Sequence, residues 1–134
     1  MAKEIHVVAA VMENPEGELL CALRGPSMTL PNVWEFPGGK VKAAEAHAAA
    51  LEREIEEELG CRIRAGGELH VHTHDYGSAV VTLHCLQADI IEGVPSPSEH
   101  SKLLWMPRAQ LQSLVWAPAD VPAVTMLSGG AARS

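Results

Sequence analysis

Residues 39–60 read GKVKAAEAHAAALEREIEEELG, and the second half of this stretch has the composition of a single helix. Strong helix formers run without Gly or Pro from Ala46 to Leu59, and Gly60 supplies a stop signal. An apolar stripe recurs at helical spacing and consists of Ala48, Leu51, Ile55 and Leu59. The stretch therefore predicts an amphipathic helix over residues 46–59 that packs on the core through this stripe.

Three carboxylates gather on a second face of the predicted helix. Glu54, Glu57 and Glu58 stand at positions i, i+3 and i+4, roughly 110° from the apolar stripe on a helical wheel. Like charges at this spacing destabilise a helix, whereas Mg²⁺ prefers oxygen ligands and neutralises such a group. We interpret this face as a divalent-cation site. The alternative, an acidic helix face exposed to water, accounts for neither the preceding double glycine nor Arg53.

The spacing of the charged and glycine residues resembles the Nudix box. The matching pattern is Gly39-x5-Glu45-x7-Arg53-Glu54-Ile55-x-Glu57-Glu58-x-Gly60, followed by Cys61 in a position that is usually aliphatic. The lead-in at residues 34–40, WEFPGGK, resembles the MutT branch, whose members hydrolyse nucleoside triphosphates. The chain departs from the pattern on both sides of Glu45: residues 42–44, KAA, stand where relatives carry a Glu-Pro-Gly turn, and Ala46 and His47 replace the usual hydroxyl N-cap and proline.

The resemblance implies a role for each matched residue. Glu54 is the first candidate for the general base, because metal coordination lowers the pKa of bound water. Arg53, also counted among the catalytic candidates, is expected to pair with Glu45 or a neighbouring carboxylate and hold the cluster in shape. The implied ligands of Mg²⁺ or Mn²⁺ are the carbonyl of Gly38 and the carboxylates of Glu54, Glu57, Glu58 and Glu99. The implied structural positions of the box are Gly39, Glu45 and Gly60.

Three of the candidates lie outside the helix. Glu99 stands in a predicted loop before Trp105, where MutT-like proteins carry a metal-binding or water-activating glutamate. Arg24, at the end of a predicted strand, and Lys40, after the double glycine, resemble residues near the triphosphate. For each of the three, an ordinary solvated side chain is the alternative.

Residues 116–122, WAPADVP, resemble the segment with which MutT-type enzymes contact the base. Asp120 stands where the 8-oxoguanine-selective enzyme has Asn. An ionised Asp only accepts hydrogen bonds, so it is expected to favour a base edge that donates them. The alternative is a helix N-cap. Trp34 and Trp116 have the shape to stack on a base, although tryptophans of small domains more often belong to the core.

His70, His72 and His74 project from one face of a predicted strand. Three imidazoles raise the possibility of a zinc site. Positions i, i+2 and i+4 spread along an extended strand and do not converge readily on one ion. We therefore interpret them as a partly exposed sheet face or a wall of the substrate pocket.

The chain as a whole predicts a single α+β domain over residues 1–134. Strands are predicted at residues 5–12, 19–24, 69–76, 79–88 and 103–106, with helices after Pro107 and over 117–127 in addition to 46–59. This agrees with the fold that the resemblance implies, an α/β/α sandwich with a mixed β-sheet between helices.

The composition limits the kinds of binding partner and the cellular compartment that we expect for this chain. The net charge of −7 argues against binding to a nucleic-acid polymer, and no apolar run approaches the roughly 20 residues of a membrane span. The three cysteines are widely spaced and form no CxxC, which indicates reduced thiols and a cytoplasmic protein. Protein partners and oligomeric state cannot be predicted from the sequence.

The resemblance implies a MutT-like enzyme that hydrolyses a nucleoside triphosphate to the monophosphate and pyrophosphate. Sanitation of oxidised substrates such as 8-oxo-dGTP and hydrolysis of CTP or a modified pyrimidine triphosphate both stay open. Hydrolysis of ADP-ribose or dinucleoside polyphosphates is less favoured by the lead-in WEFPGGK. The alternative of another class is a catalytically silent domain that binds nucleotides, although no box carboxylate is lost here.

Overall fold

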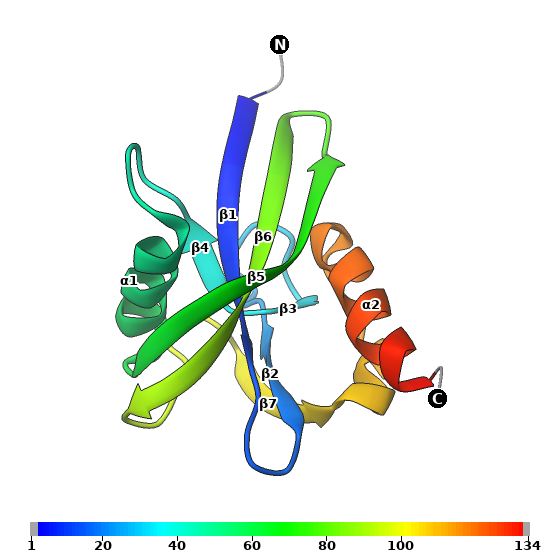
Figure 1. Cartoon of the computed structure of the whole chain (residues 1–134). Coiled ribbons are helices and arrows are strands. Elements are labelled where there is room, and N and C mark those ends of the chain that lie inside the picture. The colour runs from blue at the N-terminus through cyan, green and yellow to red at the C-terminus, as the bar shows by residue number, and fades with distance from the viewer. Residues whose placement is uncertain (1–2, 133–134) are drawn as a thin grey trace.

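The computed structural model describes residues 3–132 as two β-sheets with a long helix on either side (Figure 1). In chain order, the elements are β1 (Lys3–Met12), β2 (Glu18–Leu23), β3 (Trp34–Glu35), β4 (Gly38–Lys40), α1 (His47–Leu59), β5 (Arg62–Asp75), β6 (Ala79–Glu92), β7 (Lys102–Pro107), the 3₁₀ helices η1 (Arg108–Ser113) and η2 (Pro118–Asp120), and α2 (Val121–Ala132). The predicted α+β class, with a mixed sheet between helices, is confirmed.

The larger sheet has the strand order β4-β1-β6-β5 and is mixed. Strand β1 pairs in parallel with β6 and antiparallel with β4, and β5 and β6 form an antiparallel hairpin. The strands β3, β2 and β7 form a separate antiparallel sheet in the order β3-β2-β7, which the sequence did not predict. The apolar run of β1 is explained by its central position, since helices cover both faces of the larger sheet.

Alternate residues of β1 belong to two separate cores. Val8 and Ala10 pack with the buried face of α1, including Leu51. Ala9 and Val11 pack with residues of α2 on the opposite side of the sheet. Each long helix thus buries its apolar side against one face of the larger sheet, and α1 holds its remaining faces free for polar side chains.

Helix α1 begins at His47, and its capping residue Ala46 makes no side-chain hydrogen bond. The hydroxyl cap that the resemblance leads one to expect is therefore missing in the structure as well as in the sequence. At the other end Gly60 adopts the left-handed φ of 71°, and its N–H donates to the carbonyl of Glu56. Glycine tolerates this conformation and ends the helix where the sequence predicts.

The two C-terminal helices differ from the prediction. Residues after Pro107 form a 3₁₀ helix, and the predicted helix over residues 117–127 divides into η2 and α2. The cause is pairing with β3: the Trp34 N–H donates to the carbonyl of Val115, and the Ala117 N–H donates to the carbonyl of Trp34, both at 2.8 Å. This segment therefore stays extended up to Pro118, and α2 begins only at Val121.

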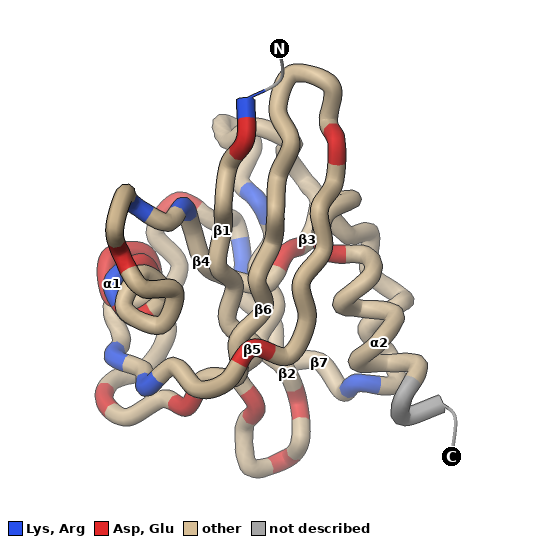
Figure 2. Tube along the Cα trace, turned by 45° about the horizontal axis from the view of Figure 1, so that its top comes forward, with Lys and Arg blue, Asp and Glu red and all other residues tan. Residues whose placement is uncertain are grey.

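Acidic residues are concentrated on α1, whereas α2 carries no charged residue (Figure 2). The three cysteines are buried free thiols, as expected. Among the described residues, no helix has both the length and the apolar character needed to cross a membrane.

Candidate active site

Arg53 organises the charged face of α1. Its Nε and Nη2 donate to the two carboxylate oxygens of Glu45 at 2.8 and 2.9 Å, and Nη1 donates to Glu54 at 3.0 Å. Nη2 also donates to the carbonyl of Lys40 at 3.1 Å. The hydrogen bonds from Arg53 and from the Lys42 backbone lower the pKa of Glu45 to about 2. The expected pairing of Arg53 with Glu45 is present, and it ties the loop before α1 to the middle of the helix.

Glu54 lies directly against the double glycine of β4. A Cβ atom added at Gly39 would overlap the Glu54 carboxylate, so only glycine allows this approach. Gly38 pairs with Ala9 of β1, and a Cβ there would overlap the backbone of Val8. The two glycines therefore bring strand β4 close enough to line one space together with Glu54.

Glu58 is the most perturbed carboxyl of the helix. Its Oε1 is buried and has no hydrogen-bond partner among the described residues. Burial, with the nearby Glu54 charge as the second cause, raises the pKa of Glu58 to about 7. A buried carboxylate oxygen without a partner costs free energy unless a cation or a proton compensates it. The cluster around Glu54 and Glu58 thus fits a divalent cation, which would supply the missing partner.

The other two predicted carboxylate ligands lie differently. Glu57 is more than half exposed and accepts a hydrogen bond from Arg53 Nη1 at 3.3 Å. Glu99 is exposed and is not among the residues that line the cavity beside Glu54 and Glu58. In the described chain, therefore, Glu54 and Glu58 share one space, whereas Glu57 and Glu99 do not line it.

A cavity of about 650 Å³ joins the acidic cluster to the C-terminal segment. One part of its wall is charged and contains Arg24, Lys40, Glu54 and Glu58, next to the two glycines. Another part is largely aromatic and apolar, and consists of Phe36, Tyr76, Ala117, Ala119 and Asp120, with Val81 and Leu83 of β6. The two parts have the chemical character needed for a polyphosphate and for a base.

Arg24 lines this cavity but already has partners. Its Nη1 donates to Glu35 at 2.7 Å, and Nη2 and Nε donate to the hydroxyl and the carbonyl of Thr29 at 3.0 and 2.7 Å. Arg24 therefore holds the loop over residues 25–33 against β3. A phosphate would compete with Glu35 for this guanidinium.

Glu35 and His100 are site residues that the sequence analysis did not identify. The second oxygen of Glu35 lies 2.7 Å from Nε2 of His100, a buried ring whose Nδ1 has no partner among the described residues. The proximity of His100 also favours the charged form of Glu58. The available sequence signals were positional, since Glu35 lies within the lead-in WEFPGGK and His100 directly follows the predicted ligand Glu99.

Asp120 is 5% exposed and lies at the aromatic part of the cavity. Its Oδ2 accepts a hydrogen bond of 3.0 Å from the backbone N–H of Phe36, 84 residues away in sequence. Burial, and secondarily the charge of Glu35, raise the pKa of Asp120 to about 8. Burial thus favours the protonated carboxyl in the free protein, whereas the sequence analysis expected an ionised, acceptor-only carboxylate. A protonated carboxyl both donates and accepts, as Asn does.

The aromatic residues around Asp120 divide between core and wall. Trp116 is buried; its indole N–H donates to the carbonyl of Leu111 at 2.7 Å, and its ring packs on Phe36 with centroids 4.9 Å apart. Trp116 is therefore a core residue. The Tyr76 hydroxyl accepts a 3.0 Å hydrogen bond from the backbone of Ala119, which fixes η2 over the cavity.

The histidines of β5 do not converge. The rings of His72 and His74 are 6.1 Å apart between centroids, and His74 contacts Tyr76 edge-on at 4.5 Å. This agrees with the interpretation of a partly exposed sheet face next to the pocket wall.

Comparisons with known proteins agree with the fold and the box. The family model described as NUDIX domain matches residues 3–126. The Escherichia coli (strain K12) protein named CTP pyrophosphohydrolase is 34% identical over 120 residues, covering 90% of this chain and 88% of the relative. The protein named 8-oxo-dGTP diphosphatase from the same organism is 25% identical over 125 residues, covering 93% of this chain and 97% of the relative. A solution NMR structure of MutT, of the family Nudix hydrolase, from methicillin-resistant Staphylococcus aureus 252 is 38% identical with a TM-score of 0.77, covering 97% of this chain and 99% of that chain. On this evidence, the chain belongs to the Nudix hydrolase family.

Proposed function

We propose that this protein is a Mg²⁺- or Mn²⁺-dependent nucleoside triphosphate pyrophosphohydrolase of the MutT type. It acts as one catalytic domain and converts a ribo- or deoxynucleoside triphosphate, oxidised or modified bases included, to the monophosphate and pyrophosphate. The main support for this proposal is a single cavity whose wall contains both the carboxylates of Glu54 and Glu58 and the aromatic residues around Asp120. Buried free cysteines support a reducing compartment such as the cytoplasm.

The metal requirement is supported by the acidic cluster itself. Nudix hydrolases use a divalent metal ion, and the unpartnered Oε1 of Glu58 together with the Glu54 carboxylate offers the oxygen ligands that hard cations prefer. The carbonyl of Gly38, at the same cavity, is a further proposed ligand. The resemblance to MutT-like Nudix proteins adds the carboxylates of Glu57 and Glu99, which would have to turn toward the cavity to reach the ion. When bound, the cation neutralises triphosphate charge and lowers the pKa of a coordinated water.

The residues of the chain divide the remaining work. Glu54 is the proposed general base that accepts the proton of the attacking water. Arg53 acts as a positioning residue, since it touches Glu45, Glu54 and Glu57 and keeps the acidic cluster in one arrangement. Lys40 is exposed at the cavity rim, and with Arg24 it is the proposed partner of the triphosphate.

Base recognition is assigned to the pocket around Asp120. A neutral carboxyl presents both a donor and an acceptor, which suits the Watson–Crick edge of cytosine as well as that of an oxidised guanine. Relatives named for both activities, CTP pyrophosphohydrolase and 8-oxo-dGTP diphosphatase, support keeping both substrates as candidates.

The deciding experiment measures the release of pyrophosphate and of orthophosphate from a panel of nucleotides in the presence of Mg²⁺. The panel consists of CTP, 5-substituted dCTP, 8-oxo-dGTP, ADP-ribose and unmodified triphosphates. We expect pyrophosphate and monophosphate from a triphosphate, and no turnover in EDTA. A rate in EDTA equal to the rate in Mg²⁺ would contradict the proposed metal dependence. Tight nucleotide binding without turnover of any panel member would identify a silent binding domain instead.

A further inference from the structure

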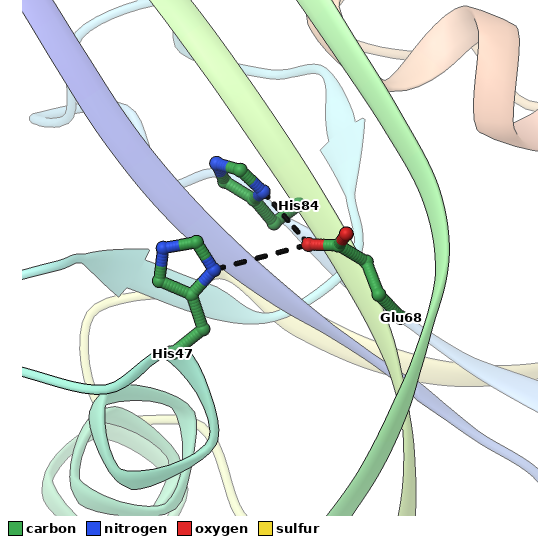
Figure 3. A group of neighbouring side chains, drawn as sticks. All are labelled: His47, Glu68 and His84. Carbon is green, nitrogen blue, oxygen red and sulfur yellow. Dashed lines mark hydrogen bonds and ion pairs between the residues drawn. The ribbon is translucent and has the colours of Figure 1, made fainter.

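A histidine-rich cluster, part of which is drawn in Figure 3, lies on the α1 side of the larger sheet, and none of its residues lines the cavity just described. His47 is the first residue of α1, Glu68 comes from β5 and His84 from β6. A third imidazole, His6 of β1, lies beside His84. Four elements, β1, α1, β5 and β6, thus bring three histidines and one glutamate to one place.

The potential ligand atoms of three of these residues face one another. His47, Glu68 and His84 each offer one atom, and the three atoms lie within 4.8 Å of one another. Glu68 Oε2 is 2.8 Å from His84 Nδ1 and 3.8 Å from His47 Nδ1. Ligands at the Zn–N and Zn–O lengths of about 2.0–2.2 Å in a tetrahedron are about 3.4 Å apart. The partly exposed side chains of His47 and Glu68 would therefore move by about 0.5–1.5 Å to accommodate an ion.

A β-bulge directs Glu68 toward this cluster. Strand β5 shifts register between Ala65 and Glu68 and again between Glu68 and His70. As a result Glu68 pairs with Leu86, which belongs to the core under α1, whereas His70 pairs with Cys85 of the opposite core. Regular alternation would have placed Glu68 on the face of His70. Bulges often redirect a side chain at a functional site.

The surroundings suit a bound ion that is both held and reachable. His84 is 8% exposed, whereas the side chains of His47 and Glu68 are about two-fifths exposed and can adjust. The remaining nitrogen of His84, Nε2, lies 3.1 Å from His6 Nδ1, and metal-bound imidazoles usually hydrogen-bond through this second nitrogen. A cavity of about 450 Å³, lined by His6, His47 and the loop over residues 40–45, opens beside the cluster and offers a path for entry.

We propose that His47, Glu68 and His84 bind a transition-metal cation of the Zn²⁺ class, with His6 orienting His84. Neutral imidazole and carboxylate are ligands that Zn²⁺ accepts readily, unlike the all-oxygen set that Mg²⁺ prefers in the box. The bound cation would fasten the first turn of α1, which has no side-chain cap, to strands β5 and β6. This site shares none of the proposed Mg²⁺ ligands and does not depend on the proposed catalytic function.

The test uses Co²⁺ as a spectroscopic probe for Zn²⁺. Metal-stripped protein is kept in excess Mg²⁺, which occupies the box, and is titrated with Co²⁺ while the visible absorption and the Tm are followed. We expect one Co²⁺ per chain with the intense absorption of a four-coordinate site, a Tm that rises with Co²⁺, and displacement by Zn²⁺.

Two half-exposed ligands supply the variants, because removal of the buried His84 could prevent folding. His47→Ala and Glu68→Gln are each expected to weaken Co²⁺ binding by about tenfold or more. His72→Ala removes a histidine outside the cluster, and Glu58→Gln alters the box; both should bind Co²⁺ as the wild type does. Unchanged affinity in His47→Ala and Glu68→Gln, or loss of the Co²⁺ signal in Glu58→Gln or His72→Ala, would overturn the proposal.

Discussion

Replacing Asp120 with Asn is expected to stabilise the metal-free protein at pH 8. Burial and the charge of Glu35 raise the pKa of this carboxyl from 3.8 to about 8. Between these values the folded state holds a proton that the unfolded state has lost. The free energy of unfolding therefore falls as the pH rises through this window, and the contribution is fully present only below 3.8. Asn keeps an oxygen that accepts the Phe36 N–H and has no proton to lose.

The magnitude follows from the width of the window. One proton bound only by the folded state lowers the free energy of unfolding by about 1.4 kcal/mol per pH unit. The shift from 3.8 to about 8 sets an upper bound of about 6 kcal/mol. Local relaxation and water entry reduce such penalties, so we expect Asp120→Asn to gain about 1–3 kcal/mol at pH 8 and almost nothing near pH 4.

Urea unfolding in EDTA, followed by tryptophan fluorescence from pH 4 to 8, measures the effect. Glu58, whose pKa is raised to about 7, contributes a slope of the same sign, so the double variant with Glu58→Gln should be flatter still. Glu45, whose pKa is lowered to about 2, acts with the opposite sign but only below its ordinary 4.5. Asp89→Asn, at an exposed site, is the matched control. A wild-type stability that is flat or rising from pH 5 to 8, or an Asn variant less stable at pH 8, would refute the reasoning.

Three further predictions concern the cavity. In Mg²⁺, Glu54→Gln should lower kcat by about a hundredfold or more, with the fold intact by circular dichroism. The control Glu56→Gln, at an exposed position of the same helix, should keep a kcat near that of the wild type. Equal losses of kcat in both variants would contradict the catalytic role of Glu54. Gly39→Ala pushes the flexible Glu54 carboxylate aside, so kcat should fall while Tm stays near the wild-type value. A variant with a lower Tm and an unchanged kcat would contradict this role of Gly39. The ratio of kcat/KM for CTP to that for 8-oxo-dGTP should change in the wild type as Asp120 ionises above pH 8, by an amount equivalent to about 1–3 kcal/mol. Asp120→Asn should abolish this pH dependence. A pH-independent ratio in the wild type would show that Asp120 does not recognise the base.

Local spacing made the helix and its charged face predictable from the sequence. The apolar stripe, the stop at Gly60 and the pairing of Arg53 with Glu45 all depend on residues within one helix and the loop before it. The class of fold followed from the alternation of strands and helices, and the Nudix resemblance specified the sandwich.

Long-range pairing produced the features that sequence analysis missed. The burial of Asp120 depends on an extended segment that pairs with Trp34 and carries η2 across to Phe36. Likewise, Glu68 precedes the strand predicted over residues 69–76, whereas β5 begins at Arg62 and carries a bulge at Glu68 that the sequence pattern does not reveal. The loop before β7 exposes Glu99 and buries its neighbour His100, and this difference depends on the long-range contact of His100 with Glu35.

The proposed reaction of this cavity is hydrolysis of a nucleoside triphosphate between its α- and β-phosphates, with release of pyrophosphate. Phosphorus NMR of the products formed with Mg²⁺ in ¹⁸O-labelled water tests both the reaction and the point of attack. With CTP or 8-oxo-dGTP as substrate, we expect pyrophosphate that carries the label and an unlabelled monophosphate, because water attacks the β-phosphorus. Label in the monophosphate would contradict the proposed point of attack, and orthophosphate as the first product would contradict the proposed reaction.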